Sequence, residues 1–252
     1  MARTATAQRR RRATMRQRTR DANGGRNSGA TAAASHHDAG PYVPHTDDLG
    51  ELRAAASSCR GCPLHADATQ TVFGAGPRTA RVVLVGEQPG DREDREGEPF
   101  VGPAGTLLRR ALDAAGLDES AVYFTNAVKH FKFTVPEGKK RRIHKAPSLR
   151  EMTACRPWLV AELAAIQPRL VVALGATAGR ALLGTPFRLG DHRGTLEPLP
   201  GGDAREGEPD MPAAEVLVTV HPSAVLRAPD RDAAYRGLVA DLRVVARAVA
   251  RA

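Results

Sequence analysis

Three cysteines, Cys59, Cys62 and Cys155, are the only ones in this chain of 252 residues. Cys59 and Cys62 form a Cys-x-x-Cys pair, which in an intracellular chain indicates metal or redox chemistry more than a disulfide. A four-ligand site needs one further donor, and His65 and His130 are the candidates. Three thiolates and an imidazole suit zinc and a [4Fe–4S] cluster equally well, so residue types alone leave both open.

A glycine-rich stretch from Gly86 to Gly105 carries two carboxylates, Glu87 and Asp91, and one aromatic residue, Phe100. Glycines allow the backbone to pass close to a ligand. The purely structural interpretation is a loop of glycine turns with solvated acidic side chains. An aromatic ring in an otherwise polar loop favours a stacking surface for a nucleobase.

A basic stretch follows, with eight Lys or Arg residues between Lys129 and Arg150. It contains His144 and begins just beyond Asn126. Such a stretch is either a solvated loop or a segment that lies along DNA phosphates and carries an imidazole to a reacting centre. The Asn126 amide both donates and accepts hydrogen bonds, so it is able to read the edge of a pyrimidine.

His221-Pro222-Ser223 follows an apolar run near the C-terminus. A histidine fixed by a proline and by a possible serine N-cap is well placed to donate a hydrogen bond to a developing anion. A lone histidine in such a place is more often a packed core residue. Its place at the end of a predicted strand, like the other candidates, favours the functional interpretation.

Short β-branched runs predict four strands, at 81–86, 122–128, 170–174 and 215–220. Helical spacing predicts helices at 49–56, 107–115, 148–167, 176–183 and 230–250, the third with Ser148 as N-cap. Strands that alternate with helices predict a three-layer α/β/α sandwich around a mainly parallel, four-stranded sheet. Sites in such folds lie beyond the carboxyl ends of the strands, where Glu87, Asn126 and His221 fall. Residues 199–213 are predicted to be a loop.

The formal net charge of +9 is concentrated at one end of the chain. Residues 1–30 hold nine Arg and one Asp, a net of +8, which leaves +1 for residues 31–252. Residues 1–48 lack apolar periodicity and are predicted to be a disordered basic tail, which either contacts phosphates non-specifically or has no dedicated role. Residues 49–252 are predicted to be one domain. No signal sequence or membrane-spanning run is present, so we expect a cytoplasmic protein.

Taken together, these motifs resemble the uracil-DNA glycosylase superfamily, and within it the X-type group most closely. The resemblance runs from about residue 50 to the C-terminus. It is carried by Cys59-Arg-Gly-Cys62, Gly86-Glu-Gln-Pro-Gly-Asp91, Glu98-Pro-Phe-Val-Gly-Pro-Ala-Gly105, Thr125-Asn-Ala-Val-Lys-His130, Lys140-Arg-Arg-Ile-His144, Ala154-Cys-Arg-Pro-Trp158 and His221-Pro-Ser223. The Lys-Arg-Arg-Ile-His loop marks the X-type group, and the hydrolytic iron–sulfur glycosylases lack it.

The resemblance implies a structural [4Fe–4S] cluster held by Cys59, Cys62 and Cys155. His130 stands where related hydrolytic enzymes have a cysteine, and it is expected to complete the ligand set. The implied substrate is uracil-containing DNA, with single strands preferred, and we expect a monomer with no obligate protein partner and no membrane association.

The implied mechanism starts with a flipped uracil that stacks on Phe100 and bonds to Asn126, while His221 stabilises the departing anion. His144 then attacks C1′ of the sugar and forms a stable covalent adduct. Glu87, or less favourably Asp91, orients the ring of His144. The remaining substrate-binding residues implied by the resemblance are Gln88, Ser223 and Arg142, and Arg142 is expected to hold the loop against the DNA backbone.

Two other functions stay open. One is a hydrolytic, type-4-like iron–sulfur glycosylase in which a water molecule attacks C1′ and free abasic DNA is released. The other is a non-catalytic iron–sulfur protein that binds nucleic acid without preferring uracil.

Overall fold

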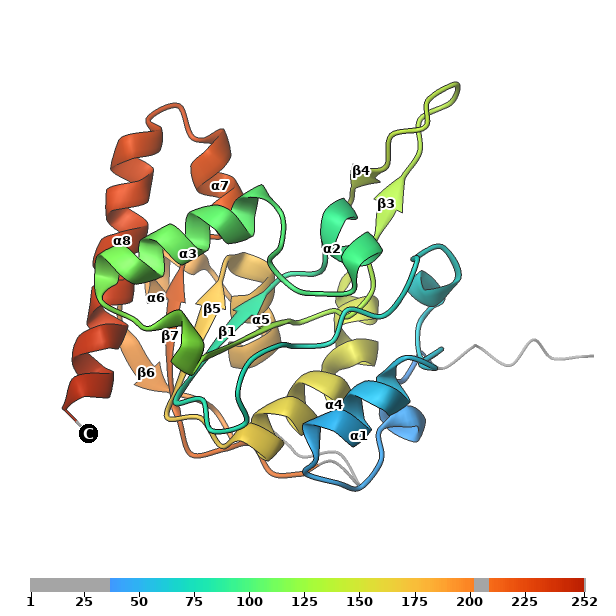
Figure 1. Ribbon diagram of the computed structural model, residues 1–252, viewed down its shortest axis with the longest axis horizontal. Coiled ribbons are helices and arrows are strands. Elements are labelled where there is room, and N and C mark those ends of the chain that lie inside the picture. Colours follow the sequence, from blue (N-terminus) through green and yellow to red (C-terminus); the bar gives the residue numbers. More distant parts are fainter. Residues whose placement is uncertain (1–36, 202–208, 252) are drawn as a thin grey trace, which may run out of the picture. The chain divides into compact units, whose positions relative to one another are not determined.

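The computed structural model describes residues 37–201 and 209–251 (Figure 1). Its main sheet has five strands in the order β2-β1-β5-β7-β6. Four of them are parallel: β1 (Val82–Gly86), β2 (Val122–Asn126), β5 (Leu170–Leu174) and β7 (Glu215–Thr219). These are the four predicted strands, so the mainly parallel α/β architecture is confirmed.

The fifth strand, β6 (Leu196–Pro198), pairs antiparallel with β7 at the edge of the sheet. The prediction of four strands missed it, because three residues that end in proline give no periodic signal. Proline is tolerated there because an edge strand leaves one row of backbone groups without ladder partners.

Helices cover both faces of the sheet, and β1 shows why. Val82 and Leu84 point into a cluster with α3 (Pro103–Ala115) and α8 (Arg231–Ala250), whereas Val83 and Val85 point into a cluster with α4 (Leu149–Ile166) and α5 (Ala176–Leu183). Successive side chains of a strand alternate between faces. The remaining helices are α1 (Leu49–Ala56), α2 (Asp91–Glu96), α6 (Leu189–His192) and α7 (Pro222–Arg227), with 3₁₀ turns at Gly40–Tyr42, Pro63–Ala66 and Glu119–Ala121.

Helix α4 begins as the sequence predicts. Ser148 accepts a hydrogen bond from the Glu151 backbone, and the Glu151 side chain accepts one from the Ser148 backbone. This reciprocal capping box satisfies two of the backbone donors that a helix start leaves open. The helix therefore starts at a fixed point at the end of the basic stretch.

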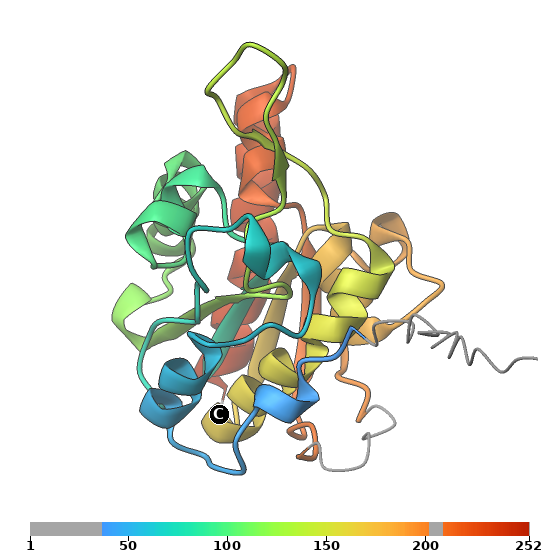
Figure 2. The same ribbon diagram turned by 90° about the vertical axis from the view of Figure 1, so that its right-hand side faces the viewer.

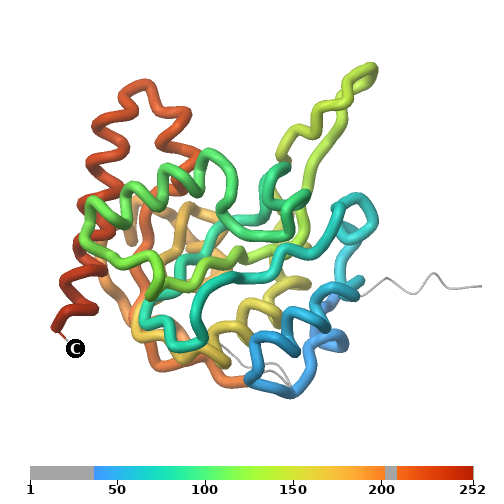
Figure 3. Tube along the Cα trace, in the orientation of Figure 1, coloured from blue at the N-terminus to red at the C-terminus, as the bar shows by residue number. Residues whose placement is uncertain are grey.

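The basic stretch forms a second, two-stranded sheet that projects from the main one (Figures 1 and 2). Strand β3 (Phe133–Thr134) pairs antiparallel with β4 (Ile143–His144), so that Phe133 lies opposite His144. The tube in Figure 3 follows this hairpin away from the sheet and back into α4. The sequence predicts only a basic loop here, because two-residue strands leave no pattern.

The domain begins earlier than residue 49. Residues 37–48 belong to the same compact unit as the rest of the described chain. Ala39 is buried, and its N–H donates to the Ala154 carbonyl at 2.8 Å. The predicted boundary was wrong for these residues because one buried alanine and a short turn show no periodicity. Residues 1–36 of the predicted tail and 202–208 of the predicted loop lie outside the described residues. Within the described part, no helix is long and apolar enough to cross a membrane.

Candidate active site

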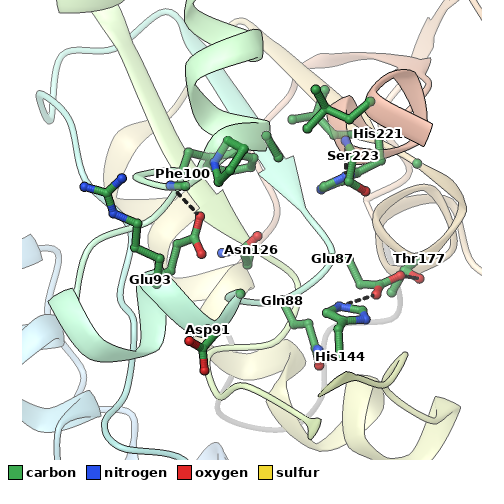
Figure 4. Close-up of a pocket in the computed structure, with 18 of the residues that line it drawn as sticks. Glu87, Gln88, Asp91, Glu93, Phe100, Asn126, His144, Thr177, His221 and Ser223 are labelled. Carbon is green, nitrogen blue, oxygen red and sulfur yellow. Dashed lines mark hydrogen bonds and ion pairs between the residues drawn. The ribbon is translucent and has the colours of Figure 1, made fainter. Parts of the chain in front are cut away.

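A cavity of about 840 Å³ opens beyond the carboxyl ends of the parallel strands (Figure 4). Glu87 directly follows β1, Asn126 ends β2, and His221 stands two residues after β7. Topology places a site at this edge of the sheet. The structure brings eight of the sequence-predicted residues to the cavity wall: Glu87, Gln88, Asp91, Phe100, Asn126, His144, His221 and Ser223.

Phe100 is held more rigidly than an aromatic in a flexible loop. Its side chain is buried, and its backbone adopts a left-handed φ of 58°. Arg109 of α3 donates a hydrogen bond to its carbonyl oxygen. A Cβ at Gly105 would lie 1.6 Å from the same oxygen, so only glycine fits there. The ring is therefore fixed before any ligand arrives.

Phe100 and Asn126 meet over the end of β1. A Cβ at Gly86 would lie 2.3 Å from Asn126 Oδ1 and 2.7 Å from Phe100 Cζ. Glycine at this position allows the amide and the aromatic ring to approach the same point. An aromatic face beside an amide edge suits a planar base that carries both donors and acceptors.

His221 is half-buried and carries a neutral ring. The Ser223 backbone N–H donates to His221 Nδ1 at 3.1 Å, and the Ser223 hydroxyl lies 2.8 Å from the same nitrogen. Burial lowers the pKa of His221 to about 4, although Glu87 acts against this shift. Because Nδ1 accepts, the single ring proton of the neutral form is on Nε2. Ser223 therefore fixes the tautomer that leaves Nε2–H as a donor.

Glu87 and His144 form a pair at the cavity wall (Figure 4). His144 Nε2 lies 3.2 Å from Glu87 Oε1, and the Thr177 hydroxyl donates to Glu87 Oε2. Burial alone would raise the pKa of Glu87, but the bonds to His144 and Thr177 and the nearby imidazoles hold it below its ordinary value. The carboxylate is thus ionised and faces an exposed imidazole.

Gln88 lines the cavity, and its side chain also bonds to the hairpin. Its amide NH₂ donates to the carbonyl oxygens of Lys132 and Lys145, at 3.1 and 3.0 Å. Its Oε1 accepts from the Lys132 N–H at 3.3 Å. Both amide hydrogens are used in joining the two strands at the base of the hairpin, so Gln88 supports the loop that carries His144.

Arg142 is also engaged by other side chains of the protein. It does not line the cavity, and its side chain is only 12% exposed. It pairs with Asp91 and Asp94 of α2 and lies over the ring of Phe133 at 4.9 Å. These two carboxylates take up the guanidinium in this structure, and the contact of Arg142 with the DNA backbone stays a prediction. The same pairing engages Asp91, so Glu87 is the carboxylate that faces His144.

The comparisons with known proteins agree with this geometry. Residues 73–243 match the family model described as the uracil DNA glycosylase superfamily. The chain belongs to that superfamily. It is 34% identical to the type-4 uracil-DNA glycosylase of Pyrobaculum aerophilum over 72% of this chain and 86% of the relative. It is 36% identical to that of Archaeoglobus fulgidus over 73% and 85%, and 36% identical to that of Thermotoga maritima over 67% and 78%.

Sequence reasoning missed three residues that shape this glycosylase-family site. Thr177, in the first turn of α5, orients Glu87. Glu93 of α2 lines the cavity and accepts the Gly102 N–H at 3.0 Å, which holds the Phe100 loop. Arg109 bonds the Phe100 carbonyl. One signal was available for Thr177. It lies two residues after Gly175, which directly follows β5, so it falls at the carboxyl end of a strand.

The three cysteines lie together in one buried cluster with α1 and α4, and Cys59 and Cys62 fall outside the range matched by the family model. Cys59 Sγ accepts from Trp158 Nε1 at 3.2 Å, and Cys155 Sγ accepts from a backbone N–H at 3.3 Å. Burial raises the pKa of Cys155 to about 12. Three buried cysteine sulfurs, two of which accept N–H donors, are ligands of a kind that suits an iron–sulfur cluster or zinc.

His130, the expected fourth ligand, is buried. Its Nε2 lies 2.9 Å from the Thr71 hydroxyl, and burial lowers its pKa to about 4, so the ring is neutral. Among the described residues, no set of three His, Cys, Asp or Glu side chains stands arranged to hold a metal ion. The four-ligand set therefore stays a prediction.

Proposed function

We propose that this chain is a uracil-DNA glycosylase that removes uracil from DNA and then captures the sugar covalently through His144. Membership of the superfamily and the three type-4 relatives support uracil removal. Capture is supported by one observation above all, the His144 imidazole at the cavity wall with Glu87 at 3.2 Å.

The first step is entry of the flipped base. Phe100 offers a fixed ring for stacking, and Asn126 offers a donor and an acceptor for the pyrimidine edge. Flipping costs least when the base is unpaired, so single-stranded DNA is the proposed preferred substrate. As the bond between C1′ and N1 breaks, its electron pair leaves with uracil, and His221 Nε2–H donates to the oxygen that gains charge.

The second step closes the sugar onto His144. The cleaved sugar is electrophilic at C1′, and a neutral imidazole supplies a lone pair that forms a C–N bond. The alkylated ring then carries a positive charge. Ionised Glu87, already paired with this ring, neutralises that charge. Bond breaking and bond making are then balanced, with uracil anion as leaving group and no water consumed.

Hydrolytic release is the second candidate, and the names of the type-4 relatives favour it. It requires a water held by a carboxylate next to C1′. Here Glu87 Oε1 faces His144 and Oε2 accepts from Thr177, so both oxygens already bond side chains. The imidazole already stands beside Oε1, where such a water would be held, and this supports capture.

A denaturing gel with a uracil-containing oligonucleotide separates the two. The wild-type protein is expected to give a band that survives SDS and heat, and a thymine oligonucleotide gives none. His144→Ser is expected to lose the band but still release uracil, because the smaller side chain admits water. His45→Ser, at an exposed histidine away from the site, is the matched control. A persistent band with His144→Ser would exclude His144 as the nucleophile.

We also propose that Cys59, Cys62, Cys155 and His130 hold a [4Fe–4S] cluster. When bound, such a cluster would tie the chain around α1, the segment after β2 and α4 together without taking part in bond cleavage. Iron and acid-labile sulfide are expected in equal amounts in protein purified without oxygen. Cys155→Ser is expected to lose both. Zinc in place of iron and sulfide would contradict the proposal.

A further inference from the structure

Lys129 is a buried cation that takes no part in the proposed steps of base removal and sugar capture. The sequence counts it with the basic stretch, but its side chain is completely buried, as is that of its partner Glu162 in α4. The ammonium pairs with Glu162 and also donates to Thr125 Oγ1 at 2.7 Å and to the Asn126 carbonyl oxygen at 2.8 Å. It therefore takes no part in binding phosphates.

This arrangement uses the full bonding capacity of the lysine. An ammonium has three hydrogens, and three acceptors surround this one. Burying an ion pair costs desolvation that an apolar pair of similar volume would avoid. A charged pair that stays buried despite this cost indicates that the lysine serves to position a neighbouring group more than to stabilise the fold. The acceptor that belongs to the site is the backbone of Asn126.

The segment after β2 is fixed at each of its residues. Ala127 N–H donates to the Gly86 carbonyl at 2.9 Å, and Val128 N–H donates to the Glu87 carbonyl at 3.1 Å. The Lys129 N–H donates to Cys155 Sγ at 3.3 Å, while its side chain reaches back to Asn126. The lysine thus joins the peptide that orients the Asn126 side chain to the helix that carries the buried thiol.

We propose that Lys129 is a positioning residue for base recognition. A charge-assisted hydrogen bond from its ammonium fixes the Asn126 carbonyl, and with it the direction in which the Asn126 amide enters the cavity. The inference rests on the proposed contact between Asn126 and uracil. It does not depend on whether the sugar is captured or hydrolysed.

The test compares variants of the hydrogen-bond network around Lys129 and Glu162. The variants differ in whether the side chain that is replaced contacts Asn126. Lys129→Met combined with Glu162→Gln removes the cation without leaving a buried charge unpaired. Tyr123→Phe is the matched control, since the Tyr123 hydroxyl donates to Glu162 at 3.0 Å but does not touch Asn126. The measurement is the single-turnover rate of bond cleavage, summed over free uracil and adduct. Affinity for uracil-free DNA and the thermal unfolding midpoint are followed in parallel.

The paired variant is expected to cleave at least about tenfold more slowly, whereas Tyr123→Phe stays within about twofold and both bind uracil-free DNA normally. In an Asn126→Ala background, the paired change is expected to cause little further loss, because residues that act through one another are not additive. Full activity in the folded paired variant, or an equal loss in the Asn126→Ala background, would overturn the inference.

Two further outcomes are separable. If the paired variant does not fold, Thr125→Val removes one of the three acceptors and leaves both charges in place; a rate about threefold lower supports the inference, and an unchanged rate overturns it. If Asn126→Ala alone cleaves at the wild-type rate, the proposed base contact fails. A slow Asn126→Ala with a fast paired variant leaves that contact standing and removes only the role of Lys129.

Discussion

His144 Nε2 lies 3.2 Å from Glu87 Oε1 at the wall of the cavity, and the Thr177 hydroxyl holds the other carboxylate oxygen. The two residues come from different sheets: Glu87 follows β1, and His144 ends β4 of the projecting hairpin. The contact therefore depends on how the hairpin is placed over the strand ends.

Replacing Glu87 with Gln is expected to slow adduct formation by at least about tenfold, because the imidazole loses the charge that neutralises its alkylated form. Thr177→Val is expected to give a smaller loss, since the carboxylate remains but is no longer oriented. Thr177→Ser, which keeps the hydroxyl, is the control. Rates of adduct formation on one uracil oligonucleotide check this. Equal rates for wild type and Glu87→Gln would refute the role of the carboxylate.

Arg142→Met is expected to lower the yield of adduct relative to released uracil. The guanidinium pairs with Asp91 and Asp94 and so holds the hairpin against α2. Without it, His144 spends less time at the sugar and water gains access. The measurement is the ratio of adduct to free uracil at completion. Lys140→Met, at an exposed position of the same loop, is expected to leave the ratio unchanged.

The free energy of unfolding is expected to decrease as pH falls, because of the titration of His221. Burial lowers its pKa from 6.5 to about 4 in the folded chain, so the unfolded chain binds the proton first as pH falls. The contribution to the free energy of unfolding is complete above about pH 6.5 and is lost progressively down to about pH 4. His221→Asn keeps an acceptor for the Ser223 N–H and does not titrate. Its unfolding midpoint is expected to vary less with pH across this window than that of the wild type.

DNA affinity is expected to depend on salt through the exposed hairpin cations. Replacing Lys139, Lys140 and Arg141 with Ala should reduce the slope of log affinity against log salt by about 2 for single-stranded DNA. An equal change of charge at the exposed Arg236 and Arg247 of α8 and at Arg251 directly after it is the control. An equal loss of slope in both triple variants would show that the hairpin has no special part in binding.

The strand-end residues illustrate what sequence could predict. Hydrophobic runs of β-branched residues fixed β1, β2, β5 and β7, and parallel topology then brought Glu87, Asn126 and His221 to one edge. No distance was needed for that step, because a parallel sheet carries the ends of its strands to the same side. The family motifs added His144 to the same group.

Arg142 and Gln88 illustrate what sequence could not predict. Both have side chains that suit DNA or a base, and both also bond within the protein, Arg142 to Asp91 and Asp94 and Gln88 to hairpin carbonyls. Lys129 also bonds within the protein, in its case in the core. Which partner takes up a polar group depends on tertiary contacts that sequence spacing does not encode.

The most direct measurement is mass spectrometry of the peptide that stays attached to DNA after the protein has reacted with a uracil oligonucleotide and been digested. We expect a peptide from the hairpin that carries the deoxyribose on the imidazole of His144, with free uracil released in an equal amount. Repeated uracil release with no modified peptide, or a sugar attached to another residue, would contradict it.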